Sequence, residues 1–397
     1  MTAALVMQCV DEGSISLDAP VVEQLPGFLL ADPEALRLVT PRHLMSMSSG
    51  LDTDPDPPNV DYGRGDDALT RFVHSLKDLA QVFAPGEGFS YSDASTNISG
   101  RLVEHVTGET WDEVLRTRLL EPAGLEHSAT LTEDIIHRRF AVGHQPDGSG
   151  SMTVRHIWGL SRAEAPCGTT LFSTATDLIR FGQLFIREGL SRDGNRVIPA
   201  NAVALMQERH VPVPPTLVAD WWGLGPSGRT WDGVDVMGHP GTTPAGSAYL
   251  LWTADRDLVV ATTVNAPRAG YPFAERIFKT LFDSLADIEI PGRPAPPGDV
   301  EVSSERLVGR YSNVFQTFTV APDGGTLTVA VTSRFPDSGS TPASVLEPLS
   351  PTTFLPSDPA IDGGRGTAIA FLGPETAPAT HLVNGLHALR RITGPQP

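Results

Sequence analysis

Lysine is nearly absent from this sequence of 397 residues, in which Lys77 and Lys279 are the only two. Almost all the positive charge is arginine, and 35 prolines and 38 glycines accompany it, a composition that indicates a G+C-rich genome more than a functional demand. Cysteine is equally scarce. Cys9 falls on a predicted helix face, which argues against a disulfide scaffold, and two cysteines without clustered partners make no zinc pattern. We therefore expect neither a metal nor another cofactor.

Long apolar runs are also missing. No stretch approaches the roughly 18 residues that a transmembrane helix requires, and no charged-then-apolar signal peptide precedes a cleavage site. The chain as given is expected to be cytoplasmic, with export possible if a signal peptide lies upstream. The 29 basic and 47 acidic residues give a net charge of -18, which argues against a nucleic-acid surface and against attraction to an anionic membrane.

One segment divides the chain. PGRPAPPGDV (291–300) is too rich in proline and glycine for a helix or a central strand and is typical of a short, stiff linker. Before it, YPFAERIFKTLFDSLAD carries one apolar helical stripe. After it, short strand-like runs are separated by Gly, Pro and Asp, which predicts a small antiparallel barrel or sandwich over 301–397. The remaining 1–290 form the first predicted domain.

Helices dominate the first half of 1–290, and strands the second. Thr110 and Glu113 stand in capping-box spacing, and Ser173 or Thr174 is expected to cap the helix over ATDLIRFGQLFI. From residue 231 the period switches to two, and WDGVDVMGHPG, SAYLLWT and DLVVATTVNA read as three strands, with ADRD as a turn between the last two. The pattern predicts an α+β domain in which helices flank an antiparallel sheet.

Three polar clusters lie at element boundaries. Tyr91-Ser92-Asp93 opens a helix, His239-Pro240-Gly241 lies in or beside a strand, and SMSSGL (46–51) is a predicted loop. Each has an ordinary structural interpretation: a helix cap, a turn and a serine-rich loop. Their order along the chain is what points to chemistry.

That order resembles the serine β-lactamase and penicillin-binding-protein-like hydrolases, in the branch near class C β-lactamases, D-amino-acid peptidases and related esterases. The resemblance is collinear over about 1–285 and is carried by five segments. These are MTAALVMQCVDEGSISLDAPVVEQLP, TPRHLMSMSSGLD, FAPGEGFSYSDASTNISGRLVEHVTG, APCGTTLFSTATDLIRFGQ and GHPGTTPAGSAYLLWTADRDLVVATTVNA. In the same way, the tail 301–397 resembles the lipocalin-like barrel appended to many of these hydrolases.

The resemblance implies an acyl-serine mechanism. It assigns Tyr91 as the base, His239 as a contact to substrate or transition state, and the N–H of Thr242, after Gly241, as an oxyanion-hole donor. Asp93 stands where Asn is more common, and His239 where penicillin-recognising members often carry Lys. The expected partner is a small-molecule or peptide substrate.

The opening MTAALVMQCVDEG reads as a helix without a beginning, since nothing before it caps its free N–H groups. In the family, a Ser-x-x-Lys motif lies just before this point on the same helix, and the serine is the nucleophile. No Ser-x-x-Lys occurs anywhere in the 397 residues.

Two hypotheses follow from this absence. In one, the chain is a serine hydrolase whose nucleophile segment lies upstream; in the other, it is a catalytically inactive pseudoenzyme or ligand-binding protein of the same fold. Ser48 and Ser49 are poor substitutes for the nucleophile, because a nucleophile must lie within hydrogen-bond reach of its base. Without the family's first strands, the sheet is expected to expose an edge beside the HPG strand and to self-associate there.

Overall fold

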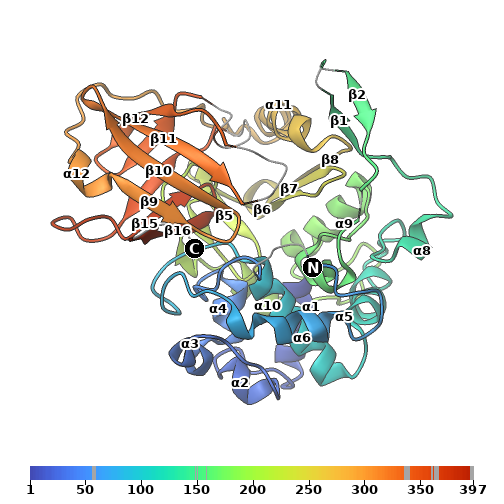
Figure 1. The fold of residues 1–397 in the computed structure, drawn as a ribbon. Helices are drawn as coiled ribbons and strands as arrows, with labels where there is room; N and C mark the ends of the chain where they lie inside the picture. Colours follow the sequence, from blue (N-terminus) through green and yellow to red (C-terminus); the bar gives the residue numbers. More distant parts are fainter. Residues whose placement is uncertain are drawn as a thin grey trace.

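The computed structural model describes residues 1–55, 60–147, 149, 151–157, 159–334, 340–358, 361 and 366–393. Figure 1 shows a helical region, a central sheet whose flanking helices include α11 (Pro267–Ala286), and a β-barrel at one side of the molecule. The described helices include none that is both long and apolar enough to cross a membrane.

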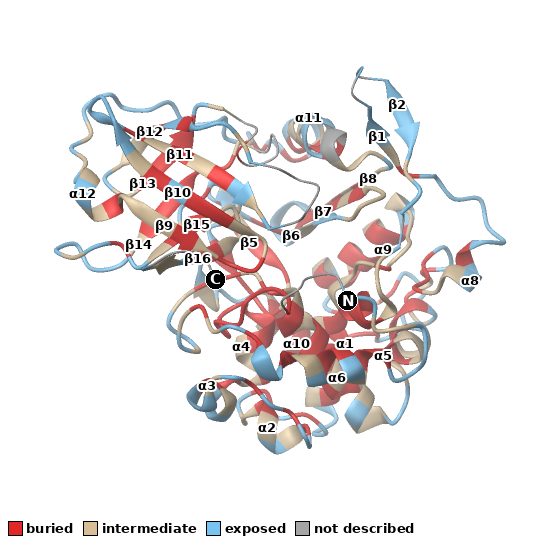
Figure 2. Ribbon diagram, viewed as in Figure 1, coloured by how far each residue is buried: buried red, intermediate tan, exposed pale blue. Residues whose placement is uncertain are grey.

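The helical region is built around two buried helices, α1 (Thr2–Asp11) and α6 (Asp93–Thr107), which pack on each other. In Figure 2 buried residues lie along the inner faces of α1, α6 and α10. The other helices of the chain are α2 (Val21–Gln24), α3 (Pro33–Leu38), α4 (Pro41–Met45), α5 (Ala68–Ser75), η1 (Leu76–Asp78), α7 (Trp111–Leu115), η2 (Arg116–Leu120), α8 (Thr132–Ile135), η3 (Arg162–Cys167), α9 (Ala175–Ile186), α10 (Ala200–Gln207), η4 (Ala254–Arg256), α11 (Pro267–Ala286) and α12 (Ser304–Leu307).

The predicted caps are found in the structure. The Thr110 side chain accepts from the N–H of Glu113 at the start of α7. Thr174, rather than Ser173, caps α9 by accepting from the N–H of Asp177. Such contacts satisfy backbone donors that have no partner within the helix.

The central sheet is antiparallel, with strand order β3-β4-β5-β6-β7-β8. Its strands are β3 (Val211–Pro212), β4 (Trp221–Trp222), β5 (Ser227–Trp231), β6 (Val234–Thr242), β7 (Ser247–Thr253) and β8 (Leu258–Val264). The last three are the strands predicted from the alternating pattern. A separate hairpin of β1 (His144–Pro146) and β2 (Met152–Val154) is exposed and projects from the body of the molecule (Figures 1 and 2).

The position predicted for an exposed edge is wrong. β6, the strand that carries His239, pairs with β5 on one side and with β7 on the other. The edge strands are β3 and β8. The prediction failed because β3, β4 and β5 come earlier in the chain and are too short to show alternation. Any pairing of this sheet with another chain would therefore use β3 or β8.

The C-terminal region is a closed eight-stranded barrel, as the run of short strands predicted. Its interior holds one apolar cluster that includes Tyr311, Phe318 and Phe354. The strands are β9 (Gly309–Ser312), β10 (Gln316–Asp323), β11 (Thr326–Ser333), β12 (Ser344–Ser350), β13 (Thr353–Pro356), β14 (Ile369–Leu372), β15 (His381–Asn384) and β16 (His387–Ile392). Residues 291–300, between α11 and the barrel, form no helix or strand.

A glycine allows two elements beside the site to approach closely. A Cβ at Gly100 on α6 would lie 2.5 Å from the Cβ and Cγ of Pro166 on η3, and 3.3 Å from Cδ1 of Trp111. Both neighbours belong to buried segments that cannot retreat freely. Gly100 therefore sets the distance between α6, which begins at Asp93, and η3, which ends at Cys167.

We expect Gly100→Ala to destabilise the fold by about 1–3 kcal/mol, because the added methyl group forces η3 away from α6. Urea unfolding followed by circular dichroism measures the change. Gly292→Ala is the matched control, since a Cβ there meets nothing within 4 Å. Equal stability of the two variants would show that the approach at Gly100 carries no constraint.

Candidate functional site

A large cleft, with a volume of about 2110 Å³, joins the helical region, the sheet and the barrel. All five residues predicted for the site line it: Tyr91, Asp93, His239, Gly241 and Thr242. Their common position in one cleft is consistent with the roles that the family resemblance implies.

Tyr91 is held at the start of α6. Ser92 caps the helix by accepting from the N–H of Ser95, and its hydroxyl donates to the carbonyl of Asp52. The Tyr91 ring lies 5.8 Å from Trp222 and 5.9 Å from His239, between ring centroids. Burial, together with the nearby Asp93 carboxylate, raises the pKa of the Tyr91 phenol well above its usual value. In this environment Tyr91 is a neutral phenol.

Acidic groups are concentrated around Tyr91. Burial, followed by the charge of Asp54, raises the pKa of Asp93 to about 7. Burial and the charges of Asp54 and Asp93 raise the pKa of Glu164 to about 8. Burial and the charges of Asp93 and Glu164 raise the pKa of the Cys167 thiol well above its usual value. Among the influences on these four groups from the part of the chain that the structure describes, none is a cation, so burial and like charge favour their protonated forms.

His239 on β6 is a neutral imidazole. Burial lowers the pKa of His239 to about 4, against the opposing effect of its contact with Pro240. Its Nδ1 lies 2.6 Å from the carbonyl oxygen of Pro240. Since a carbonyl can only accept, Nδ1 carries the proton and Nε2 is left as an acceptor.

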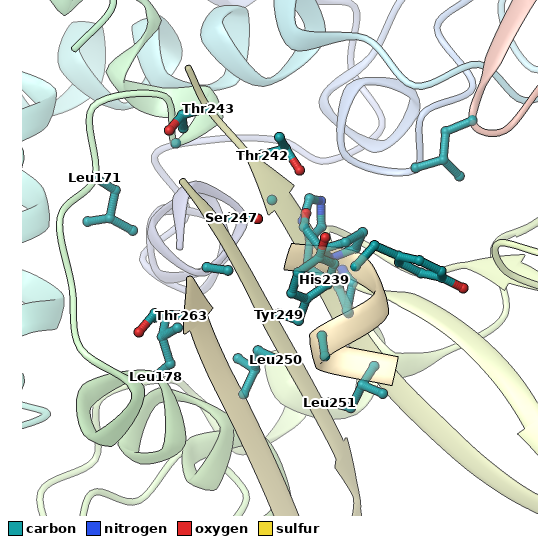
Figure 3. A pocket seen from close by; sticks show the side chains of 18 of the residues that line it. Leu171, Leu178, His239, Thr242, Thr243, Ser247, Tyr249, Leu250, Leu251 and Thr263 are labelled. Carbon is teal, nitrogen blue, oxygen red and sulfur yellow. The ribbon is translucent and has the colours of Figure 1, made fainter. Parts of the chain in front are cut away.

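Gly241 and Thr242 occupy the end of β6, opposite Ala248 and Ser247 of β7. Figure 3 shows Thr242 and His239 along one strand, with Ser247 and Tyr249 on the neighbouring strand. Both Gly241 and Thr242 are exposed to solvent within the cleft. A ligand can therefore approach the backbone here.

The barrel supplies one wall of the site, through residues 384–387. The turn between β15 and β16 reaches Tyr91: the Tyr91 N–H donates to the carbonyl of Leu386 at 2.8 Å. The ring of His387 lies 5.8 Å from the Tyr91 ring, at 88°. Asn384, Gly385, Leu386 and His387 all line the cleft. No motif marks these residues, because they reach Tyr91 only when the barrel docks.

The serine-rich loop does not contribute a nucleophile. Ser49 is buried and its hydroxyl lies 2.8 Å from that of Ser95; Ser48 is buried against Ser46, at 2.9 Å. Neither Ser48 nor Ser49 lines the cleft, whereas Met47, directly before Ser48, does.

The loops 53–67 and 143–165 contribute no described residue to the cleft lining. Residues 56–59, 148, 150 and 158 of these loops lie outside the described residues. Among the described residues, no group of three or more His, Cys, Asp and Glu side chains is arranged to hold a metal.

Comparisons with known proteins agree with the motif pattern. A sequence model of the family described as Beta-lactamase matches residues 1–280. The chain is 37% identical to Penicillin-binding protein 4 of Amycolatopsis lactamdurans over 78% of this chain and 81% of that protein. It is 29% identical to a lovastatin esterase of Penicillium rubens over 53% of this chain and 57% of that protein.

Among solved structures, SurE superposes over 98% of this chain and 85% of its own, with a TM-score of 0.77 at 24% identity. A structure of SurE with D-Leu gives 0.75 at 25% identity over the same shares. An octameric penicillin-binding protein homologue from Pyrococcus abyssi gives 0.59 at 21% identity, covering 98% of this chain and 85% of that one. These matches extend through the barrel.

The raised pKa of Glu164 predicts that stability falls as pH rises. A carboxyl whose pKa is higher in the folded than in the unfolded state stabilises the fold at low pH, and this contribution is lost as pH rises through its folded pKa, here about 8. Glu164→Gln removes the charge at nearly constant shape, so we expect it to raise stability at pH 8 by on the order of 1–4 kcal/mol and to have little effect at pH 4.

Melting temperatures measured from pH 4 to pH 9 test this prediction. The exposed Glu133 provides a matched control, Glu133→Gln, which is expected to follow the unaltered chain throughout. If the melting temperatures of all three proteins changed in parallel with pH, Glu164 would not be buried as a proton-binding group.

Proposed function

The chain belongs to the β-lactamase family, and we propose that it is a serine hydrolase that cleaves an amide, peptide or ester through an acyl-serine. The 397 residues contain no Ser-x-x-Lys, so the proposal assigns the nucleophilic serine and its lysine to residues preceding Met1. Tyr91 is the base, the N–H of Thr242 is an oxyanion-hole donor, and His239 accepts a hydrogen bond from substrate or leaving group.

The electrostatics around Tyr91 are the observation that carries this proposal. Tyr91 and Asp93 are partly buried acids, and among the described residues no cation contributes to stabilising their charged forms. The two lysines are elsewhere: Lys77 follows α5 and Lys279 pairs with Glu275 on α11. One ammonium group beside Tyr91 would lower the pKa values of both acids and allow Tyr91 to act as a base. The family's lysine has this chemistry.

The start of α1 supports the same assignment. Met1, Thr2 and Ala3 line the cleft together with Tyr91 and His239. A helix rises 1.5 Å per residue, so one more turn before Thr2 brings new side chains to the same cleft. A serine and a lysine three positions apart share one face of such a turn.

The neutral His239 favours uncharged acyl groups at this position. Family members that recognise penicillin often carry a lysine there, which offers a permanent charge to a carboxylate. A neutral Nε2 acceptor instead suits a donor such as an amide N–H or an alcohol. The similarity to a lovastatin esterase and to a penicillin-binding protein supports ester and amide substrates.

Hydrolysis of p-nitrophenyl butyrate and nitrocefin tests the proposal. We expect background rates for residues 1–397 alone, and turnover when the reading frame preceding Met1 supplies a Ser-x-x-Lys segment. Substituting Ala for that serine should abolish turnover, and Tyr91→Phe should lower kcat on the order of 10²- to 10⁴-fold.

Two outcomes would refute this assignment. One is turnover by residues 1–397 alone that Tyr91→Phe abolishes, since the chemistry would then need no added serine. The other is a stop codon directly before Met1, which leaves the ligand-binding pseudoenzyme as the favoured function.

The state of His239 predicts the acidic limb of the pH profile. If the neutral ring is the active form, kcat/KM falls as pH drops through about 4, the pKa of His239, rather than near the usual value of about 6.5. His239→Lys should raise affinity for carboxylate-bearing β-lactams and weaken ester turnover.

The exposed His137 supplies the control variant, His137→Lys, for the same kinetic comparison. If His239→Lys and His137→Lys both left the two activities unchanged, His239 would be a turn residue with no role in substrate binding.

A further inference from the structure

Arg229 is a cation in the cleft that has no use in the proposed chemistry. It lies on β5 opposite Val236 of β6, and directly opposed residues point to the same face of a sheet. Val236 packs in a cluster with Phe278 and Phe282 of α11. The Arg229 side chain therefore lies on the α11 face, while His239, three residues beyond Val236, points to the other face.

The guanidinium of Arg229 is partly buried and lacks an anionic partner. It stacks over the Trp231 ring, 5.2 Å from the centroid, and makes no hydrogen bond or ion pair with any residue that the structure describes. Burial lowers the pKa of Arg229, and the opposing influences of Tyr271 and Asp220 do not cancel this effect. Asp220, whose charge acts on Arg229, accepts a hydrogen bond from the N–H of Thr230.

Arg209 shows the same stacking with its charge satisfied. Its guanidinium lies 4.0 Å from the centroid of Trp221 and donates to both oxygens of Asp235, at 2.7 and 2.9 Å. Arg209 does not line the cleft, whereas Arg229 does. The two arginines differ in one respect. A carboxylate is bound to Arg209, whereas no described carboxylate is bound to Arg229.

The walls beside Arg229 are aromatic and apolar. Tyr249 on β7 and Tyr271 on α11 lie 6.3 Å apart between ring centroids, and both line the cleft. Ile290, residues 291–294 of the linker, and barrel residues such as Ile361 and Thr367 line the same cleft. A stacked guanidinium keeps its N–H edges free, which suits a planar carboxylate bound through two parallel hydrogen bonds.

We propose that Arg229 forms a subsite for an organic carboxylate that carries an aromatic or bulky apolar group. The carboxylate takes the position at Arg229 that Asp235 takes at Arg209, and the apolar group packs against Trp231, Tyr249 and Tyr271. The subsite lies on the α11 side of the sheet, so its ligand is held away from the reactive position beside Tyr91. It does not depend on the proposed hydrolase activity, because it is defined by equilibrium binding.

Calorimetric titration of the 397-residue protein with phenylacetate and with its neutral isostere phenylacetamide tests the subsite. We expect phenylacetate to bind at least tenfold more tightly than the amide, and also more tightly than acetate or inorganic phosphate, which lack the apolar group. The affinity for phenylacetate should fall with added salt, as expected for a charge interaction.

Arg229→Gln should reduce binding of phenylacetate at least tenfold, Arg229→Lys should retain part of it, and Arg209→Gln should leave it unchanged. Melting curves establish that each variant is folded. Equal binding of phenylacetate and phenylacetamide by the unaltered protein would overturn the proposal without any variant. Equal losses in Arg229→Gln and Arg209→Gln would also overturn it, and phosphate binding as tight as phenylacetate would exclude the aromatic part of the subsite.

Discussion

The contact between the β15–β16 turn and the start of α6 holds the site together. Tyr91 donates its backbone N–H to Leu386, and the Ser90 hydroxyl accepts the N–H of Ala388 at 3.1 Å. Close by, the Thr216 hydroxyl donates to Gly385 at 2.6 Å. These bonds fix the barrel against both the helical region and the loop before β4. Without these bonds Tyr91 would still stand just before α6, but it would lose its contact with the barrel.

The site also holds several ionisable side chains that are shielded from solvent without a compensating charge. The same desolvation that keeps His239 neutral also favours the protonated forms of Tyr91, Asp93, Glu164 and Cys167. On the α11 face the imbalance has the opposite sign, with Arg229 stacked on Trp231 and no carboxylate bound to it. On each face of the sheet there is thus a group whose charged form would be stabilised by a partner of opposite charge.

Local patterns are sufficient to predict much of this fold. The alternation over 247–253 and 258–264, the caps at Thr110 and Thr174, and the glycine and proline in 291–300 all depend on near neighbours in sequence. The position of β6 within the sheet could not be predicted this way, because β4 consists of two tryptophans and shows no period. Strand order is a property of long-range pairing.

The residues of the site also divide into those that local motifs predict and those that depend on long-range contacts. Tyr91, Asp93, His239, Gly241 and Thr242 could be found because they belong to motifs. Leu386 and His387 could not, since their role depends on how two separately patterned regions meet, and Arg229 could not, since its significance lies in a partner that is missing. Cys167 carried no signal beyond its type; only the close approach at Gly100 brings it beside Asp93.

The barrel contact also has a kinetic consequence. Ser90 and Ala388 are 298 residues apart in sequence, and contacts of such separation form late, after the local hairpins and helices that they join. The barrel strands pair with near neighbours along the chain and can close by themselves, apart from the long-range closure of β9 on β16. The cleft therefore matures only when the barrel has closed and docked, so a newly made chain acquires its complete site at the last step of folding.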